Sequence, residues 1–167
     1  MYKRQLTLWA TVVAERFGHD RAAALTFGKA VAGYAAYAKA RSLGIVEDSR
    51  ESPGDRRKRE TAKPETVDVM GKRIPVATTA DGVRALDTDG NPIKPAAVEK
   101  YLTSKFRDGL KDVQAAMVEL AKSVPPAELR KCAFGLYEIF RPEIPAGVKG
   151  WGAKGELDVE RIKSARA

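Results

Sequence analysis

The sequence predicts a mainly helical α+β domain, with about four main helices packed as a bundle and a small antiparallel β-hairpin or meander inserted in the middle. Apolar residues recur every three or four positions over several long stretches, which is typical of helices that pack on a core. A central segment instead alternates β-branched and polar residues around glycine turns. At 167 residues, 44% of them hydrophobic and 31% charged, the chain suits a single domain. We expect that domain to cover residues 1–141 and a Gly- and Pro-containing tail to follow at 142–167.

The first two helices are predicted at about residues 7–17 and 20–43. Only a tight turn separates them, and Asp20 is well placed to cap the second helix because its carboxylate can accept free backbone N–H groups. A helix-turn-helix DNA reader has the same outline. The second helix contains no Asn or Gln for reading base edges, so we favour a plain structural hairpin.

The second helix is expected to be the element around which the others are arranged. Small residues recur at every fourth position, on one face, which favours close packing of another helix and leaves a dimer interface as the alternative. The longest uncharged run, 30–38, is too short for a bilayer span of about 20 residues, so we predict no membrane contact. The small-residue ridge consists of Ala24, Gly28, Ala32, Ala36 and Ala40. The larger apolar side chains expected in the core are Leu25, Phe27, Val31, Tyr34, Tyr37 and Leu43.

Residues 47–66 change character, because charged residues, proline and serine replace the aliphatic ones. This composition predicts a flexible charged loop. Four adjacent cations can contact phosphates without reading a sequence; the alternative is a solvated loop. The basic run consists of Arg56, Arg57, Lys58 and Arg59.

A small β insertion is expected at residues 67–94. Gly71-Lys72 is a plausible hairpin turn, and Pro75 predicts an edge strand because proline lacks an N–H donor. The run 87–91 resembles a calcium loop, but Val98 stands where an EF-hand requires glutamate, so we interpret it as a turn. The predicted strand pairs are 67–70 with 73–76, and 83–86 with 92–94.

Two C-terminal helices complete the predicted bundle. The longer one begins at Pro95, a residue favoured at a first helical position, and continues to about Ser123 with uninterrupted apolar periodicity. Pro125-Pro126 ends it. The last predicted helix covers about 127–140.

The tail satisfies the spacing G-x-G-x-x-G at Gly150, Gly152 and Gly155. A dinucleotide fingerprint also needs a preceding strand, a following helix and an acidic residue about 20 positions further on, and the chain has no room for them. The nearby cations and tryptophan favour contact with phosphates and stacking on a base, or else a tryptophan docked on the core. These candidate residues are Lys149, Trp151 and Lys154.

Catalytic machinery is not recognisable. His19 is the only histidine and Cys132 the only cysteine, so the sequence offers no structural zinc set and no intramolecular disulfide. An Asp20–His19 pair for general base chemistry is conceivable, but no nucleophile accompanies it. We assign no catalytic residue, no metal and no cofactor.

The net charge of +8 and a pI near 9.6 indicate an anionic partner. We therefore hypothesise a non-enzymatic basic binding protein that associates with nucleic acid through non-specific phosphate contacts. The alternatives are a protein–protein or homodimeric module that associates through the small-residue ridge, and an enzyme with an unrecognised site. We find no signal peptide pattern, so the expected location is the cytoplasm.

Overall fold

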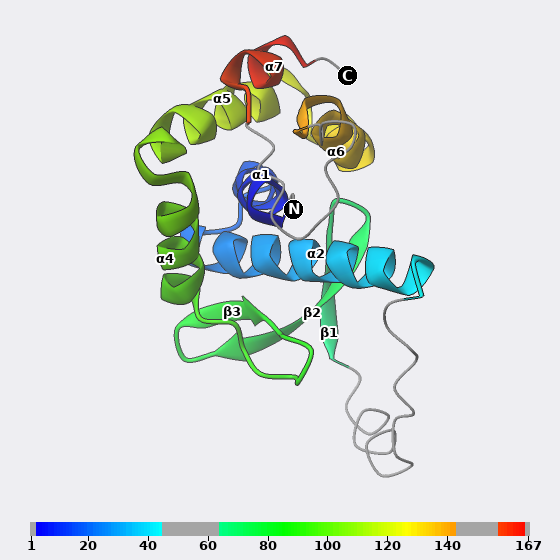
Figure 1. Ribbon diagram of the computed structural model, residues 1–167. Helices are drawn as coiled ribbons and strands as arrows, with labels where there is room; N and C mark the ends of the chain where they lie inside the picture. Colours follow the sequence, from blue (N-terminus) through cyan, green and yellow to red (C-terminus); the bar gives the residue numbers. More distant parts are fainter. Residues whose placement is uncertain (1–2, 45–63, 143–156, 166–167) are drawn as a thin grey trace.

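The computed structural model describes residues 3–44, 64–142 and 157–165. It confirms the predicted mainly helical α+β fold, with a three-stranded antiparallel sheet between the second helix and the helices that follow (Figure 1). The helices are α1 (Lys3–Arg16), α2 (Arg21–Ser42), α4 (Pro95–Phe106), the 3-10 helix η1 (Arg107–Gly109), α5 (Leu110–Ser123), α6 (Pro126–Phe140) and α7 (Val159–Ser164). The strands are β1 (Glu65–Val69), β2 (Lys72–Thr79) and β3 (Gly82–Ala85).

The central element is α1 rather than α2, which corrects the expectation from the sequence. Every residue from Gln5 to Ala14 is buried, and Figure 1 shows α1 nearly end-on with the other helices around it. Its threonines are compatible with burial because their hydroxyls bond within the helix: Thr7 donates to Lys3 O at 2.7 Å and Thr11 to Thr7 O at 2.8 Å. The threonines of α1 made it look partly exposed in the sequence, although its residues from Gln5 to Ala14 are buried on every side of the helix.

The predicted hairpin of α1 and α2 is confirmed. Asp20 caps α2, and its carboxylate accepts the Ala23 N–H at 3.3 Å. A Cβ atom on Gly28 would collide with Thr11 Oγ1 and with the carbonyl oxygen of Thr7, so only glycine permits this approach of the two helices. The first part of the small-residue ridge thus packs as predicted, whereas Ala36 and Ala40 are only half-buried.

The sheet has the order β1-β2-β3. The turn between β1 and β2 is at Met70-Gly71, where both residues have positive φ, one position earlier than expected. β1 begins at Glu65, within the segment predicted as loop. The predicted second hairpin is present only in part. β3 pairs along its length with β2, and the segment after it forms the isolated antiparallel bridge Leu86↔Pro92, with Ile93 N donating to Ala85 O at 2.8 Å.

Pro75 lies in the central strand, so the prediction of an edge strand is also wrong. It sits just beyond Val76↔Ala85, the last pair of the β2–β3 ladder, where a missing N–H interrupts no ladder bond. Its carbonyl still accepts Leu86 N at 2.9 Å. Residues 87–91 form a turn, as predicted. The Asp87 carboxylate accepts the N–H groups of Asp89 and Asn91, both at 2.9 Å.

The sheet is joined to α2 by a buried hydrogen-bond relay. Thr26 Oγ1 donates to Ala23 O at 2.7 Å and accepts Ala85 N at 3.0 Å. Thr26 and Ala85 are both fully buried. Since a buried N–H without a partner is costly, this hydroxyl fixes the position of β3 on α2.

Replacing Thr26 by valine is expected to lower the free energy of unfolding by about 1–2 kcal/mol, because the buried Ala85 N–H loses its acceptor. Thr26→Ser keeps the hydroxyl and should lose distinctly less. Urea unfolding measures both variants. A valine variant that is no less stable than the serine variant would contradict the role of the hydrogen bond, because valine removes only the hydroxyl and serine removes only the methyl.

The predicted long helix at 95–123 is divided, which is a further correction. Arg107 has a left-handed backbone (φ 50°) and Gly109 follows in η1, so the chain turns between α4 and α5. The turn lets α4 pack against α2 while α5 packs against α1 (Figure 1). A single straight helix could not contact both.

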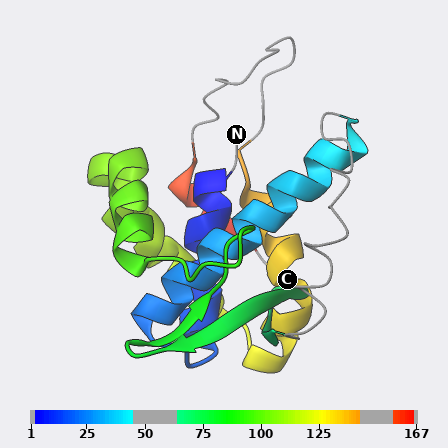
Figure 2. The same cartoon turned by 90° about the horizontal axis from the view of Figure 1, so that it is seen from below.

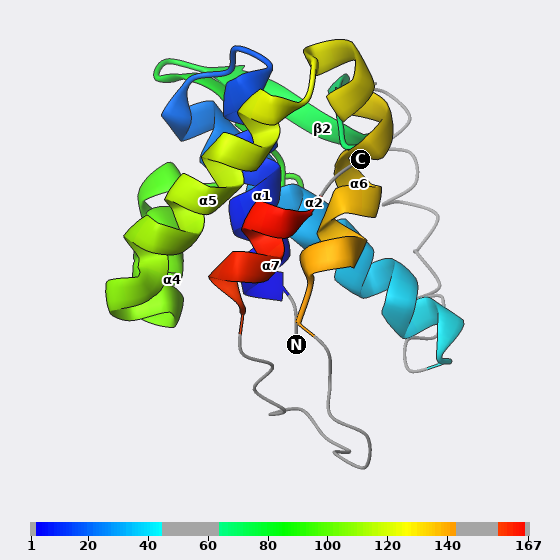
Figure 3. The ribbon, with the colours of Figure 1, turned by 90° about the horizontal axis from the view of Figure 1, so that it is seen from above.

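The C-terminal segment ends in a helix that the prediction of a tail missed. Asp158 caps α7 by accepting Glu160 N at 2.9 Å, and Ile162 is fully buried. α7 packs against α5 and α6, and Figure 3 shows it between them, above α1. Within 3–44, 64–142 and 157–165, no helix is long and apolar enough to cross a membrane.

Candidate nucleic-acid interface

The contact residues predicted from the sequence lie outside the described residues, so their assignment remains a prediction. They are Arg56, Arg57, Lys58, Arg59, Lys149, Trp151 and Lys154. The described part of the chain adds two basic features, both involving α2.

The first feature is a group of cations where the start of α1 meets the middle of α2, which we call the α1–α2 cation cluster: Lys3, Arg4 and Lys29. Two aromatic rings of α4 help to position it. Lys29 Nζ lies 4.7 Å from the centroid of the Tyr101 ring, and Arg4 Cζ lies 5.7 Å from that of Phe106. Arg4 Nη1 also donates to Lys105 O at 3.2 Å. The packing of α4 on α2 therefore holds these side chains in place.

No carboxylate of the described residues neutralises the two lysines of this cluster. In the part of the chain that the structure describes, neither Lys3 nor Lys29 has a carboxylate oxygen within 4.0 Å. Burial, and secondarily the charge of Lys3, lowers the pKa of Lys29. Burial raises the pKa of the Tyr101 phenol, against a smaller opposing effect of Arg4. A bound anion would counter the repulsion between the two lysines.

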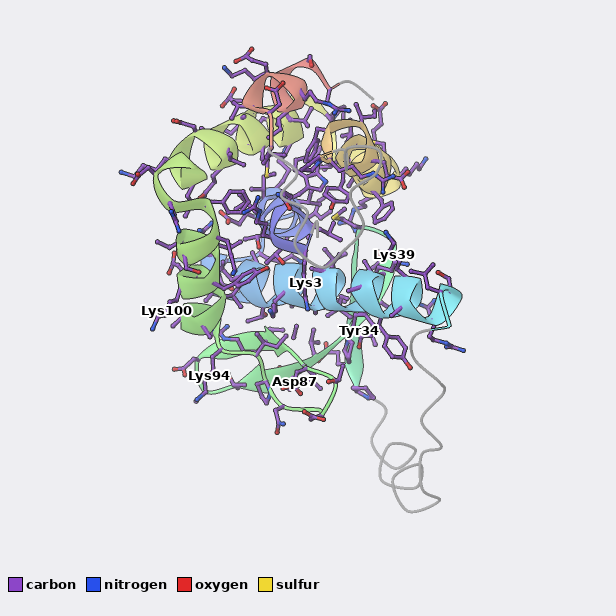
Figure 4. All side chains as sticks on the ribbon, in the orientation of Figure 1. Lys3, Tyr34, Lys39, Asp87, Lys94 and Lys100 are labelled. Atoms are coloured by element: carbon purple, nitrogen blue, oxygen red, sulfur yellow. The ribbon has the colours of Figure 1, made fainter. Side chains whose placement is uncertain are left out.

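The second feature is the charge pattern of α2. Its 22 residues include Arg21, Lys29, Lys39 and Arg41 but no Asp or Glu. Arg21 is neutralised by Glu15 at 2.8 Å and by Glu99 at 3.7 Å. No carboxylate of the described residues forms an ion pair with Lys39. Figure 4 places Lys3 and Lys39 along α2, apart from Lys94 and Lys100 on the side of α4.

The last third of α2 extends beyond the body of the protein. Figures 1 and 2 show this end projecting past the sheet and the other helices. Tyr34 and Tyr37 are 38% and 43% exposed, and Leu43 is 61% exposed. Their assignment to the core was therefore wrong, because the sheet and α6 do not reach this end of the helix. The absence of carboxylates from α2 was visible in the sequence, but the exposure of its tyrosines was not.

The side chain of His19, the only histidine of the sequence, makes a packing contact. His19 packs edge-on against Phe27, with ring centroids 4.9 Å apart, and Asp20 is engaged in capping α2.

Burial, with a smaller contribution from Glu128, raises the pKa of the Cys132 thiol, and a backbone hydrogen bond opposes it. A raised pKa favours the thiol over the nucleophilic thiolate.

One concave surface of the described residues lies beside α1. An open depression of about 340 Å³ lies between α1 and α5, lined by Val12, Glu15, Arg16, Val118, Ala121 and Lys122. It contains neither His19 nor Cys132. Among the residues that the structure describes, no group of three or more His, Cys, Asp or Glu side chains is arranged to hold a metal ion.

Comparison with protein-family models, with curated proteins and with solved structures finds no match for this chain. The functional proposal therefore rests on the chain's own residues.

Proposed function

We propose that the protein is a non-enzymatic, basic nucleic-acid-binding protein whose lysine and arginine side chains contact phosphates. The observation that carries the proposal is α2, a 22-residue helix with four cations and no carboxylate. Within this helix, burial, and secondarily the charge of Lys3 on α1, lowers the pKa of Lys29. In the sequence, the helix is followed by the basic run at 56–59. Of the cations named here, Lys3, Lys29 and Lys39 form no ion pair with a carboxylate of the described residues. A group of such lysines is the electrostatic feature expected of a phosphate-binding surface.

The expected binding is insensitive to sequence. Asn and Gln are the side chains that read adenine edges, and α2 has neither. Phosphate contacts release counterions, so affinity should fall steeply as salt rises. The net charge of +8 adds a long-range attraction toward polyanions.

The homodimer alternative has less support. The buried part of the small-residue ridge already packs on α1, where Gly28 permits the close approach. Two copies paired along the exposed part of α2 would bring cations together without carboxylates to neutralise them, and such juxtaposition of like charges is unfavourable.

A charge-matched pair of triple variants tests the proposal. K3Q/K29Q/K39Q removes three cations along α1 and α2, whereas K94Q/K100Q/K111Q removes three exposed cations of the α4–α5 side. We expect the first to weaken nucleic-acid binding by about tenfold or more and to flatten the salt dependence, with a slope change of up to about 0.9 per lost phosphate contact. K94Q/K100Q/K111Q should change the affinity and its salt dependence little.

Fluorescence anisotropy with a labelled oligonucleotide measures both variants at the same ionic strength. Equal weakening by the two variants would show that net charge alone attracts the ligand and would refute α2 as the interface. Unchanged binding by K3Q/K29Q/K39Q would refute it as well. R56A/R57A/K58A/R59A then measures the contribution of the basic run.

A further inference from the structure

We infer that the nucleic acid is bound as a single strand, with bases stacked on Tyr34 and Tyr37 at the projecting end of α2. This inference rests on the proposed function and specifies its substrate class. The two tyrosines are large and exposed, although the earlier stretch of the same helix from Ala23 to Gly28 is buried.

The two rings lie on one side of the helix. Residues three apart are offset by about 60° around the axis and about 4.5 Å along it, so Tyr34 and Tyr37 lie on successive turns of the same side of the helix. Arg41 follows Tyr37 by four positions and lies on the same side. In Figure 4, Tyr34 and Lys39 lie on opposite sides of the helix. The projecting end thus combines two aromatic rings with Arg41 on their side of the helix and Lys39 on the opposite side.

This combination fits unstacked bases better than a duplex. Proteins that hold single strands without sequence preference combine a basic surface with aromatic side chains on which bases stack. In a duplex the bases are already stacked, and a helix that enters its major groove reads it with hydrogen-bonding side chains. Apart from Lys39, Arg41 and Ser42, the projecting end of α2 offers tyrosines and alanines, and it contains no Asn or Gln.

The charge of the projecting end also favours an anionic ligand over a second copy of the chain. Lys39 has no carboxylate partner within the described ranges, and α2 supplies none to a symmetry-related α2. A polyanion would satisfy these charges, whereas a second copy would add to them.

The test compares three labelled probes of about 16 nucleotides: a single strand of mixed sequence, its duplex, and an abasic single strand that keeps the phosphates. The wild-type protein should bind the single strand at least about fivefold more tightly than the duplex or the abasic strand. Y34L/Y37L should abolish that preference while leaving the salt dependence unchanged. Y34F/Y37F, which keeps the rings, should retain it.

The outcomes separate this inference from the proposed function. Equal affinity for all three probes, or an unchanged preference in Y34L/Y37L, would overturn the stacking inference and leave phosphate binding intact. Salt-independent behaviour, or no binding of any probe, would overturn both. Self-association by sedimentation that Y34L/Y37L abolishes would assign the tyrosine surface to a protein contact and overturn the inference.

Discussion

Replacing Gly28 by alanine is expected to lower the free energy of unfolding by about 2–3 kcal/mol. Alanine is the better helix former by about 1 kcal/mol, so propensity alone predicts stabilisation. The added methyl would instead collide with Thr11 Oγ1 and with the backbone carbonyl of Thr7. Since α1 is buried on all sides, that carbonyl cannot yield without disturbing the core, and overpacking of this kind is destabilising.

Gly33 provides the matched control on the same helix. A Cβ atom there meets nothing within 4 Å, so Gly33→Ala should be neutral or stabilise by up to about 1 kcal/mol. Thermal and urea unfolding of the two variants should therefore give changes of opposite sign or clearly different size. Similar changes in both would contradict the close contact of α1 and α2 at Gly28.

Replacing Trp9 by alanine should have the largest effect on stability, about 3–5 kcal/mol. Trp9 is fully buried, its Nε1 donates to Ala133 O at 2.8 Å, and its ring packs edge-on against Phe140 with centroids 5.3 Å apart. The substitution removes the hydrogen bond and opens a cavity between α1 and α6. With a total stability of order 5–15 kcal/mol for a typical domain, much of the folding free energy would be lost.

The control for Trp9 is Ile139→Ala on α6. Ile139 is 48% exposed, so its truncation should change the free energy of unfolding by no more than about 0.5 kcal/mol. Chemical denaturation compares the two variants directly. A loss of less than about 1 kcal/mol for Trp9→Ala would contradict the placement of α1 at the centre of the core.

The helices could be predicted from the sequence because apolar periodicity reports which side of a helix is buried. The break between α4 and α5 could not, since Phe106 and Leu110 continue the same periodicity across it. The sequence contains one local signal, Gly109, which is a poor helix former. The positive φ of Arg107 is seen only in the structure. Asp158 and the apolar Ile162 likewise indicated α7 within a segment dominated by glycine and proline.

The basic interface was predictable only in part. The charge pattern of α2 is a property of its sequence, and the run at 56–59 stands out in composition. That Lys29 lies beside Lys3 depends on the crossing of α1 and α2, which Gly28 permits. That Tyr34 and Tyr37 are exposed depends on where the sheet and α6 end. Such tertiary relations are not encoded in local spacing.

The most direct test of the central proposal is the affinity of the unmodified protein for a labelled single-stranded oligonucleotide at about 50 and 200 mM salt. Phosphate contacts by the α1–α2 cation cluster and by α2 predict binding at low salt that weakens by at least tenfold at the higher salt. Absence of binding at about 50 mM, or an affinity that does not change with salt, would contradict the account.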